Sequence, residues 1–573
     1  HKTLRFGSVV EDDIMISKRR MAAGWDERPW PVRLLMSAMS VRLALLGLLA
    51  LASTVSAAGK PNFVFILCDD LGYGDVKANN ENGKIATPHM DRMARQGMRF
   101  TDAHSSSAVC SPTRYGVMTG RYNWRSRLQS GVLGGLSPRL IEEGRMTVAS
   151  MLRDQGYQTA AVGKWHLGMD WVKFPGKSVS ELNIETPDQM ASVDYSKPIA
   201  NSPTSVGFDY YFGISASLDM VPYCFIEDNH VTANPTEMMK LAMNAGAKKM
   251  EFTREGPGAP GFTGEEVLPT ITRKAVQIIT ANAIHKDRPF FLYLPLNSPH
   301  TPILPSKEWQ GKSGINLYAD YVMETDDAIG QVMKAIEDGG LADNTVVVFT
   351  SDNGCSPSAD YPTLLKAGHN PSYVFRGTKA DIFDGGHRVP FIVQWPGVVK
   401  AGAVCNQTVC LLDFMATAAD ITGFKLPENA AEDSVSLLPL LKGNGDKPVR
   451  EAIVHHSING SFSIRQGQWK LELCPDSGGW SDPRPAPANA PATAKERAKA
   501  LVAGLPPIQL YDMTTDIGEQ TNVEAGHPEV VKHLIKLLQK YVADGRSTPG
   551  AKQKNTVEPD IWMYALWDHS NPD

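Results

Sequence analysis

The sequence predicts an α/β fold: a doubly wound, mostly parallel sheet followed by a smaller lobe. Apolar runs of strand length, such as 62–67 and 345–349, lack polar alternation, which indicates strands covered on both faces. Helical patterns separate these runs along the chain, and this alternation favours parallel strands joined by crossover helices. With 573 residues, the chain is long enough for two lobes.

The expected elements follow one another in a regular order. Strand 62–67 ends at two aspartates and a glycine-rich turn, and the next helix has Thr87 as its N-cap and Pro88 as its first residue. Further helix and strand pairs are expected at 147–155 and 158–162, at 265–285 and 289–295, and at 318–338 and 345–349. Short strands at 452–455, 462–465, 469–473 and 510–512, with an amphipathic helix at 528–543, predict a small antiparallel lobe.

Three segments are expected: an upstream extension and signal peptide (1–58), a main α/β domain (59–447) and a C-terminal α+β subdomain (448–573). Arg42, the apolar run after it and the small residues up to Gly59 are typical of a cleaved export signal. The run is short for a membrane span, so we expect a periplasmic or secreted protein without stable membrane insertion. A single N-terminal anchor is the alternative.

Composition narrows the classes of function. A net charge of -5 with 21% charged residues offers no basic surface, which argues against nucleic acid as a partner. The seven cysteines are too few for a disulfide scaffold, and their spacings match no usual zinc pattern. Binding of an anionic substrate would therefore need a local cluster of cations.

Polar side chains follow four of the predicted strands at the point where each strand ends. They are Asp69, Asp70, Lys164, His166, His300, Asp352 and Asn353. Each alone is an ordinary turn residue, but ligands of open α/β sheets bind beyond the carboxyl ends of the strands. We therefore expect these side chains to converge on one crevice.

The residue types in this crevice indicate its chemistry. Three carboxylates and an amide oxygen, without imidazole or thiolate, favour calcium or magnesium over zinc. Three cations are candidates to join them: Arg114, Lys164 and Lys379. Cations beside a metal, with histidines that can exchange protons, suit a tetrahedral oxyanion such as sulfate or phosphate.

A lone cysteine, Cys110, precedes a predicted short helix capped by Ser111 with Pro112 as its first residue. The exposed N–H groups and dipole of a helix start lower the pKa of a thiol, so an activated thiolate nucleophile is one interpretation. A soft thiolate is nevertheless a poor match for a hard cation and a sulfate or phosphate ester.

The sequence Cys110-Ser-Pro-Thr-Arg114, followed by Gly120-Arg121, resembles the signature of the type I, formylglycine-dependent sulfatases. Further motifs of that family occur in order at 69–70, 163–168, 298–300, 351–354 and 376–379. The resemblance covers nearly everything from Asn62 onward. It implies the alkaline-phosphatase-like fold, with the small antiparallel sheet and helix forming the second lobe.

The resemblance also implies roles for the crevice residues. Calcium would be bound by Asp69, Asp70, Asp352, Asn353 and the modified Cys110. A separate formylglycine-generating enzyme would convert Cys110 to Cα-formylglycine, whose hydrate attacks sulfur with support from Arg114. Lys164 would contact the sulfate and His166 would remove a proton from the hydrate, while His300 and Lys379 would face the leaving oxygen. Substrate contacts are expected from Ser217, Asp219 and His369.

The expected activity is hydrolysis of sulfate esters by a sulfuric ester hydrolase. The 215–223 stretch resembles bacterial glycan sulfatases, so a sulfated carbohydrate, with galactose or N-acetylgalactosamine sulfate, is the expected substrate. Two alternatives remain open: a phosphate-ester or phosphonate hydrolase of the same superfamily, and a non-catalytic binder of sulfated glycans.

Overall fold

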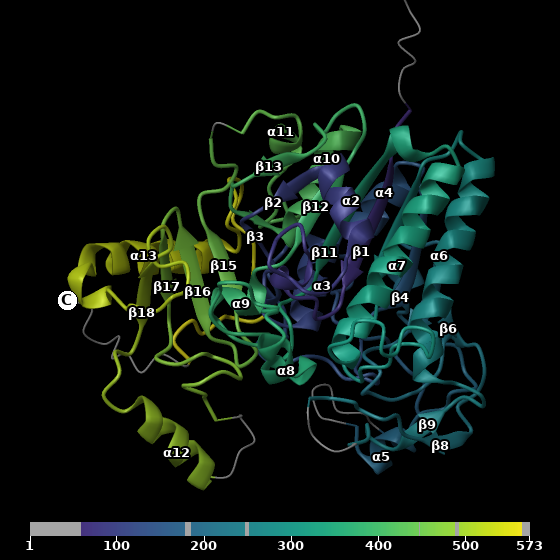
Figure 1. The fold of residues 1–573 in the computed structure, drawn as a ribbon, viewed down its shortest axis with the longest axis horizontal. Helices are drawn as coiled ribbons and strands as arrows, with labels where there is room; N and C mark the ends of the chain where they lie inside the picture. Colours follow the sequence, from purple (N-terminus) through teal and green to yellow (C-terminus); the bar gives the residue numbers. More distant parts are fainter. Residues whose placement is uncertain (1–58, 178–184, 247–250, 446, 487–491, 564–573) are drawn as a thin grey trace, which may run out of the picture. The chain divides into compact units, whose positions relative to one another are not determined.

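The structure is a computed structural model that describes residues 59–177, 185–246, 251–445, 447–486 and 492–563 (Figure 1). The predicted signal peptide and upstream extension lie outside the described residues. In the part of the chain that the structure describes, no helix combines the length and the apolar character needed to cross a membrane.

Within the described residues, the central sheet has ten strands. In spatial order they are β13 (Ala403–Cys405), β2 (Met98–Phe100), β12 (Phe391–Gln394), β11 (Thr345–Ser351), β1 (Asn62–Cys68), β10 (Phe290–Pro295), β4 (Gln158–Lys164), β5 (Tyr210–Ile214), β6 (Ile226–Glu227) and β7 (His230–Val231). The five central strands from β11 to β5 are all parallel, and antiparallel strands flank them on both sides. The predicted doubly wound, mostly parallel sheet is confirmed.

Helices cover both faces of this sheet, which explains the continuous apolar runs (Figure 1). One face packs against α2 (Pro88–Gln96), α6 (Val267–Ile284) and α7 (Leu317–Asp338), and the other against α3 (Cys110–Thr119), α4 (Val148–Asp154) and α10 (Phe414–Thr422). Val64 and Ile66 of β1 contribute to the first core, whereas Phe63 and Phe65 contribute to the second. A strand buried on both faces needs apolar residues at every position.

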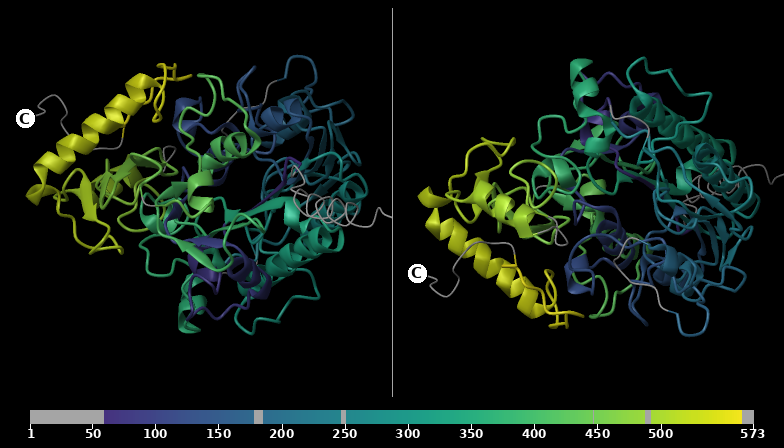
Figure 2. Two further views of the ribbon diagram at one scale, coloured as in Figure 1. Left: turned by 90° about the horizontal axis from the view of Figure 1, so that it is seen from above. Right: turned by 90° about the horizontal axis from the view of Figure 1, so that it is seen from below.

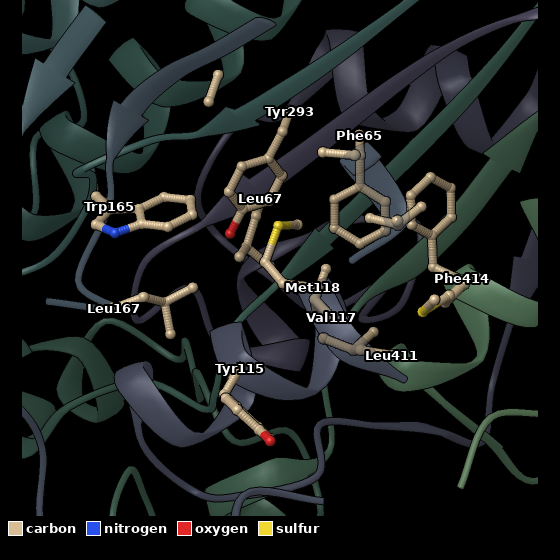
Figure 3. Close-up of a cluster of buried hydrophobic side chains, with 14 of the residues drawn as sticks. Phe65, Leu67, Tyr115, Val117, Met118, Trp165, Leu167, Tyr293, Leu411 and Phe414 are labelled. Carbon is tan, nitrogen blue, oxygen red and sulfur yellow. The ribbon is translucent and has the colours of Figure 1, made fainter. Parts of the chain in front are cut away.

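Helix α3 is anchored by the second core. Every residue of α3 is buried, and Val117 and Met118 lie below Phe65 and Leu67 of the sheet (Figure 3). The ring of Phe65 packs against Phe414 of α10 with centroids 4.5 Å apart. Such burial leaves α3 little freedom to move, so the first turn of the helix is held at a fixed place beside the ends of the strands.

The predicted boundaries differ from the structure at the start of α3. The helix begins at Cys110, with Val109 as its N-cap, and not at Pro112. Ser111 does not cap the helix; its hydroxyl accepts the backbone N–H of Leu133. Cys110 is therefore the first residue of the helix rather than a residue ahead of it.

Several shorter strands and helices lie between the main elements along the chain. They are β3 (Ala103–His104), β14 (Val409–Cys410), β8 (Glu237–Met239), β9 (Gly256–Gly258), α5 (Pro187–Met190), α8 (Tyr361–Lys366), α9 (Asp384–His387), α11 (Leu438–Leu441) and α12 (Ala492–Val502). The predicted second lobe is present as an antiparallel sheet of β15 (Ile453–His456), β16 (Phe462–Gln466), β17 (Trp469–Glu472) and β18 (Gln509–Asp512). The long helix α13 (Pro528–Asp544) packs along this sheet (Figure 2).

His456 at the end of β15 is fully buried, and its Nδ1 atom accepts a hydrogen bond from Asn123. Burial lowers the pKa of His456 from 6.5 to about 3. Because the folded protein holds the neutral ring, the contribution of His456 to stability is complete above pH 6.5 and is lost as the pH falls toward 3. The loss amounts to about 2 kcal/mol at pH 5.

We therefore predict that His456→Gln lowers the pH dependence of stability, because glutamine takes up no proton on unfolding. Urea unfolding midpoints of the two proteins at pH 7.5 and pH 5 measure the effect, and the wild type should lose more stability between these pH values. Equal losses in both proteins would show that His456 is not the titrating group.

Candidate active site

The predicted crevice forms at the carboxyl ends of neighbouring strands. Asp69 and Asp70 follow β1, Asp352 and Asn353 follow β11, His300 follows β10, and Lys164 ends β4. These strands lie side by side in the order β11, β1, β10, β4. Asp70 and His166 adopt left-handed backbone conformations, with φ angles of 64° and 55°, just after β1 and β4 end.

The acidic residues form a buried group. The Asn353 side chain donates to Asp70 Oδ1 at 2.7 Å, and the Asp70 backbone N–H donates to Asp352 Oδ1 at 3.2 Å. Asp69, Asp352 and Asn353 are completely covered, and Asp70 is 1% exposed. Several buried carboxylates so close together are stable as anions only when positive charges lie beside them.

Each carboxylate has a cationic partner. Lys164 Nζ lies 2.6 Å from Asp69 Oδ2, and Lys379 Nζ lies 2.9 Å from Asp70 Oδ2. Arg114 holds Asp352 Oδ2 through Nε at 3.1 Å and a terminal nitrogen at 2.7 Å. The three cations named from the sequence thus meet the three acids in one place.

The electrostatics differ between two of the acids. Burial opposes ionisation of Asp69, but Lys164, His300 and Arg114 together hold its pKa well below the ordinary value. For Asp352, burial and the neighbouring charge of Asp69 outweigh Arg114 and raise its pKa to about 6. Additional positive charge in this group would favour the ionised form of Asp352.

Cys110 lies at the edge of this group, at the first position of α3. Its Sγ is 3.6 Å from Lys379 Nζ and 3.7 Å from Asp69 Oδ1, and the residue is 2% exposed. Burial raises the pKa of the Cys110 thiol to about 12, in spite of the lysines nearby. The interpretation as a helix-activated thiolate is therefore wrong, because desolvation outweighs the helix start.

The two histidines present different faces to the site. His166 Nε2 lies 2.7 Å from the Leu133 carbonyl, which can only accept, so Nε2 carries the proton. Its Nδ1 is buried and has no partner among the described residues, and burial together with Lys164 and Arg114 lowers its pKa well below 6.5. His166 therefore presents a neutral ring whose Nδ1 lone pair is unpaired within the described residues. His300 directs Nδ1 at the Thr301 carbonyl and Nε2 toward Asp70 Oδ2, 3.7 Å away.

The predicted substrate contacts fall into two groups. Ser217 and Asp219 follow β5, the neighbour of β4, and Ser217 Oγ and Asp219 Oδ1 are buried without a partner among the residues described. His369, in contrast, is fully buried with Nε2 2.8 Å from Asp75 Oδ1 and Nδ1 accepting the Lys84 N–H. Neither ring nitrogen of His369 remains free for a substrate.

Two further residues at the site escaped the sequence analysis. Asp75 accepts hydrogen bonds from the Gly72 N–H and the Tyr318 hydroxyl, directly behind the turn that carries Asp70. Asp75 had a local signal, since an acid three residues after Gly72 can close the turn. Tyr318 had none, because a tyrosine near the start of an amphipathic helix is ordinary.

The oxygen donors of this group fit a hard divalent cation. Ligand atoms of Asp69, Asp70, Cys110 and His300 lie within 4.8 Å of one another. Asn353 Oδ1, beside them, is a buried oxygen without a hydrogen-bond partner among the described residues. Carboxylate and amide oxygens are the ligands that calcium prefers.

A second buried group of histidines lies where the lobes meet, and it differs from the first. His104, His387 and His455 bring ring nitrogens within 4.8 Å of one another. The rings of His387 and His455 are stacked, with centroids 3.8 Å apart and planes 10° apart. Both ring nitrogens of His387 already have protein partners, since His104 Nδ1 lies 3.0 Å from His387 Nδ1 and His387 Nε2 lies 2.9 Å from the Ile382 carbonyl.

Comparison with known proteins agrees with this site. The family model described as Sulfatase matches residues 61–424, and one described as N-sulphoglucosamine sulphohydrolase, C-terminal, matches residues 378–472. The chain is 35% identical to an N-acetylgalactosamine-6-O-sulfatase of Bacteroides thetaiotaomicron, over 84% of this chain and 93% of that protein. It is 31% identical to human arylsulfatase A, over 88% of this chain and 92% of that protein.

Solved structures of bacterial proteins are also similar to this chain. One from work on the metabolism of multiple glycosaminoglycans by Bacteroides thetaiotaomicron is 33% identical, with a TM-score of 0.68, and covers 84% of this chain and 99% of that chain. A sulfatase from a Pseudoalteromonas species shares the fold at 21% identity, with a TM-score of 0.62 over 88% of this chain and 94% of that chain. The matched range spans every strand end that carries the acids and cations of the crevice, and the chain therefore belongs to the sulfatase family, the sulfuric ester hydrolases.

Proposed function

We propose that this sulfatase hydrolyses sulfate esters of a sulfated carbohydrate, with galactose or N-acetylgalactosamine sulfate as the substrate unit. Similarity to an N-acetylgalactosamine-6-O-sulfatase over most of both chains supports the substrate class. The observation that carries the chemistry is Cys110, an un-ionised thiol held between Lys379 and Asp69. Such a thiol is a poor nucleophile, so we infer that Cys110 acts only after conversion to Cα-formylglycine.

This conversion takes the Cβ carbon from the thiol to the aldehyde level and removes the sulfur. We propose that a separate formylglycine-generating enzyme performs it with dioxygen as the oxidant, before the chain folds. The burial of Cys110 supports this order, because the side chain is 2% exposed in the folded protein. The hydrated aldehyde supplies one hydroxyl to attack sulfur and a second from which the aldehyde can re-form.

Calcium is the proposed metal, bound by Asp69, Asp70, Asp352 and Asn353 together with the modified residue 110. When bound, it supplies a Lewis acid for the sulfate oxygens and for the attacking hydroxyl. Arg114 and Lys164 bind acids of this set now, and in the proposed site they also face the sulfate and the hydroxyl at residue 110. Arg114 is further oriented by the Lys164 carbonyl, which accepts a hydrogen bond at 2.9 Å.

Proton transfers are assigned to the remaining side chains. The S–O bond to the sugar breaks as the attacking oxygen bonds to sulfur, and His300 and Lys379 neutralise or protonate the departing alcohol. His166 accepts the proton of the second hydroxyl through Nδ1, the nitrogen without a protein partner among the described residues. The bond between the Cβ carbon of residue 110 and the sulfate oxygen then breaks, so sulfate leaves and the aldehyde re-forms. Ser217 and Asp219 are proposed to bind the substrate through their unpaired buried oxygens. His369 is left out of the substrate site because both its nitrogens are occupied.

A panel of paired substrates tests this function. Sulfated galactose and N-acetylgalactosamine should be hydrolysed at least about 100-fold faster than the matching phosphate esters, because the chain belongs to the sulfatase family. Faster turnover of phosphate esters or phosphonates would favour the related hydrolases of the superfamily. Binding of sulfated glycans without turnover would indicate a non-catalytic binder.

We further propose that the protein is exported to the periplasm or the medium, where such glycans are met. The charged and apolar pattern of 42–59 supports this proposal. Peptide mass analysis of the mature N-terminus, expected from cleavage near Ala57 or Ala58, would test it.

A further inference from the structure

One buried carboxylate, Asp75, lies directly behind the turn that carries Asp69 and Asp70. Asp75 is 1% exposed, and its two oxygens accept three hydrogen bonds. Oδ2 accepts the Gly72 N–H at 2.7 Å and the Tyr318 hydroxyl at 2.6 Å, and Oδ1 accepts His369 Nε2 at 2.8 Å. None of these donors has a part in the proposed sulfate chemistry.

The hydrogen bonds of His369 leave it one orientation. The Lys84 N–H donates to Nδ1 at 3.1 Å, so the proton of the neutral ring is on Nε2 and points at Asp75. Tyr318 is equally constrained, because it is the second residue of α7 and its helix is capped by Asn316, which accepts the Ala319 N–H. Asp75 therefore joins the turn to two rigidly held side chains.

The turn itself needs this support. Asp70 has a φ angle of 64°, a left-handed conformation that is strained for a residue with a side chain. The Tyr318 hydroxyl oxygen also lies 3.2 Å from the Asp70 carbonyl, so one group touches both Asp75 and the backbone of Asp70. The next backbone N–H group of the turn, that of Leu71, donates a hydrogen bond to Ser351 Oγ at 3.0 Å.

The segment after His369 packs on the same turn. The Gly74 N–H donates to the Pro371 carbonyl at 2.7 Å. A Cβ atom at Gly72 would lie 2.5 Å from that same carbonyl oxygen, so the two backbones are in direct contact. A displacement of His369 would therefore be transmitted to the turn and to Asp70.

We propose that Asp75, Tyr318 and His369 are positioning residues that hold the Asp70 carboxylate in the geometry that binds calcium. This inference rests on the proposed calcium site. It states that the three residues support the metal ligand Asp70 indirectly, through their contacts with the backbone of the turn. Partners behind metal ligands commonly change metal affinity by about 10- to 100-fold when removed.

Calcium titration calorimetry on the chelator-stripped full-length protein, with calcium chloride as the only titrant, tests the inference without relying on activity. Tyr318→Phe removes one hydroxyl and should raise the calcium Kd by about 10-fold or more. His369→Leu should do the same, whereas His369→Gln, which keeps a donor toward Asp75, should restore most of the affinity. Tyr157→Phe is the matched control, since that buried hydroxyl donates to the Pro61 carbonyl next to the first residue of β1.

The outcomes separate the two proposals. A wild-type protein that binds no calcium would refute the proposed metal site itself. If the wild type binds calcium and Tyr318→Phe binds it equally well, the positioning role is overturned while the metal site stands. Equal weakening by Tyr318→Phe and Tyr157→Phe would also overturn it, because the effect would then follow general loss of stability.

Discussion

Replacement of Cys110 by alanine is expected to abolish sulfate ester hydrolysis, with a loss of at least about 10⁴-fold in kcat/KM. Alanine cannot be converted to an aldehyde, so no attacking hydroxyl would be available at the start of α3. The fold should persist, because the thiol makes only long contacts of 3.6 Å and 3.7 Å in the structure. Turnover of a sulfated sugar and a thermal unfolding curve measure the two effects.

Peptide mass analysis supplies the control for this prediction. In protein from its native host, the peptide that contains residue 110 should lack one sulfur and two hydrogens and carry one added oxygen. An unmodified thiol in fully active protein would contradict the proposal. Cys110→Ser should also be inactive in hosts whose maturation enzyme accepts only cysteine.

The second large effect is expected at Asp70. Asp70→Asn should abolish calcium binding and lower kcat/KM by about 10³-fold or more, because the metal contributes several kcal/mol to the transition state. The substitution also removes the carboxylate whose two oxygens lie 2.7 Å and 2.9 Å from Lys379 Nζ and leaves that buried cation without this partner. Calorimetry with calcium chloride and turnover of a sulfated sugar measure both consequences.

Asp338→Asn is the matched control for Asp70→Asn. Asp338 is an exposed aspartate of α7 whose carboxylate pairs with Lys334 one turn earlier. Exposed pairs of this kind contribute little, so stability and calcium affinity should stay at the wild-type level. Retention of calcium binding by Asp70→Asn would remove Asp70 from the ligand set.

Much of the architecture could be predicted from local patterns. The run 62–67 was correctly predicted as a two-sided strand, because only a strand between two layers of helices tolerates apolar residues at consecutive positions. The helix beginning at Pro88 was equally well marked by its first residue and by Gly97 at its end. Such signals depend on short-range backbone preferences, which one sequence displays in full.

The acids and cations of the crevice were predictable from the sequence, but the ion pairs that they form were not. Parallel strands share one carboxyl edge, so Asp69, Asp352 and Lys164 had to meet once the topology was recognised. Which cation binds which acid depends on side-chain reach across that edge. The pairing of Lys379 with Asp70 joins residues 309 positions apart, and nothing in the local sequence indicates it.

Burial accounts for the errors and omissions. Local sequence placed Cys110 at a helix start and suggested a lowered thiol pKa, whereas complete desolvation raises it. In the same way His369 was predicted to contact substrate, but packing gives both its nitrogens protein partners and links it through Asp75 to Tyr318. Periodicity and motif order were sufficient for the fold, the family and the acids and cations of the crevice. Protonation and hydrogen-bond partners were decided by tertiary contacts, because they depend on solvent exclusion and on groups that are distant in the chain.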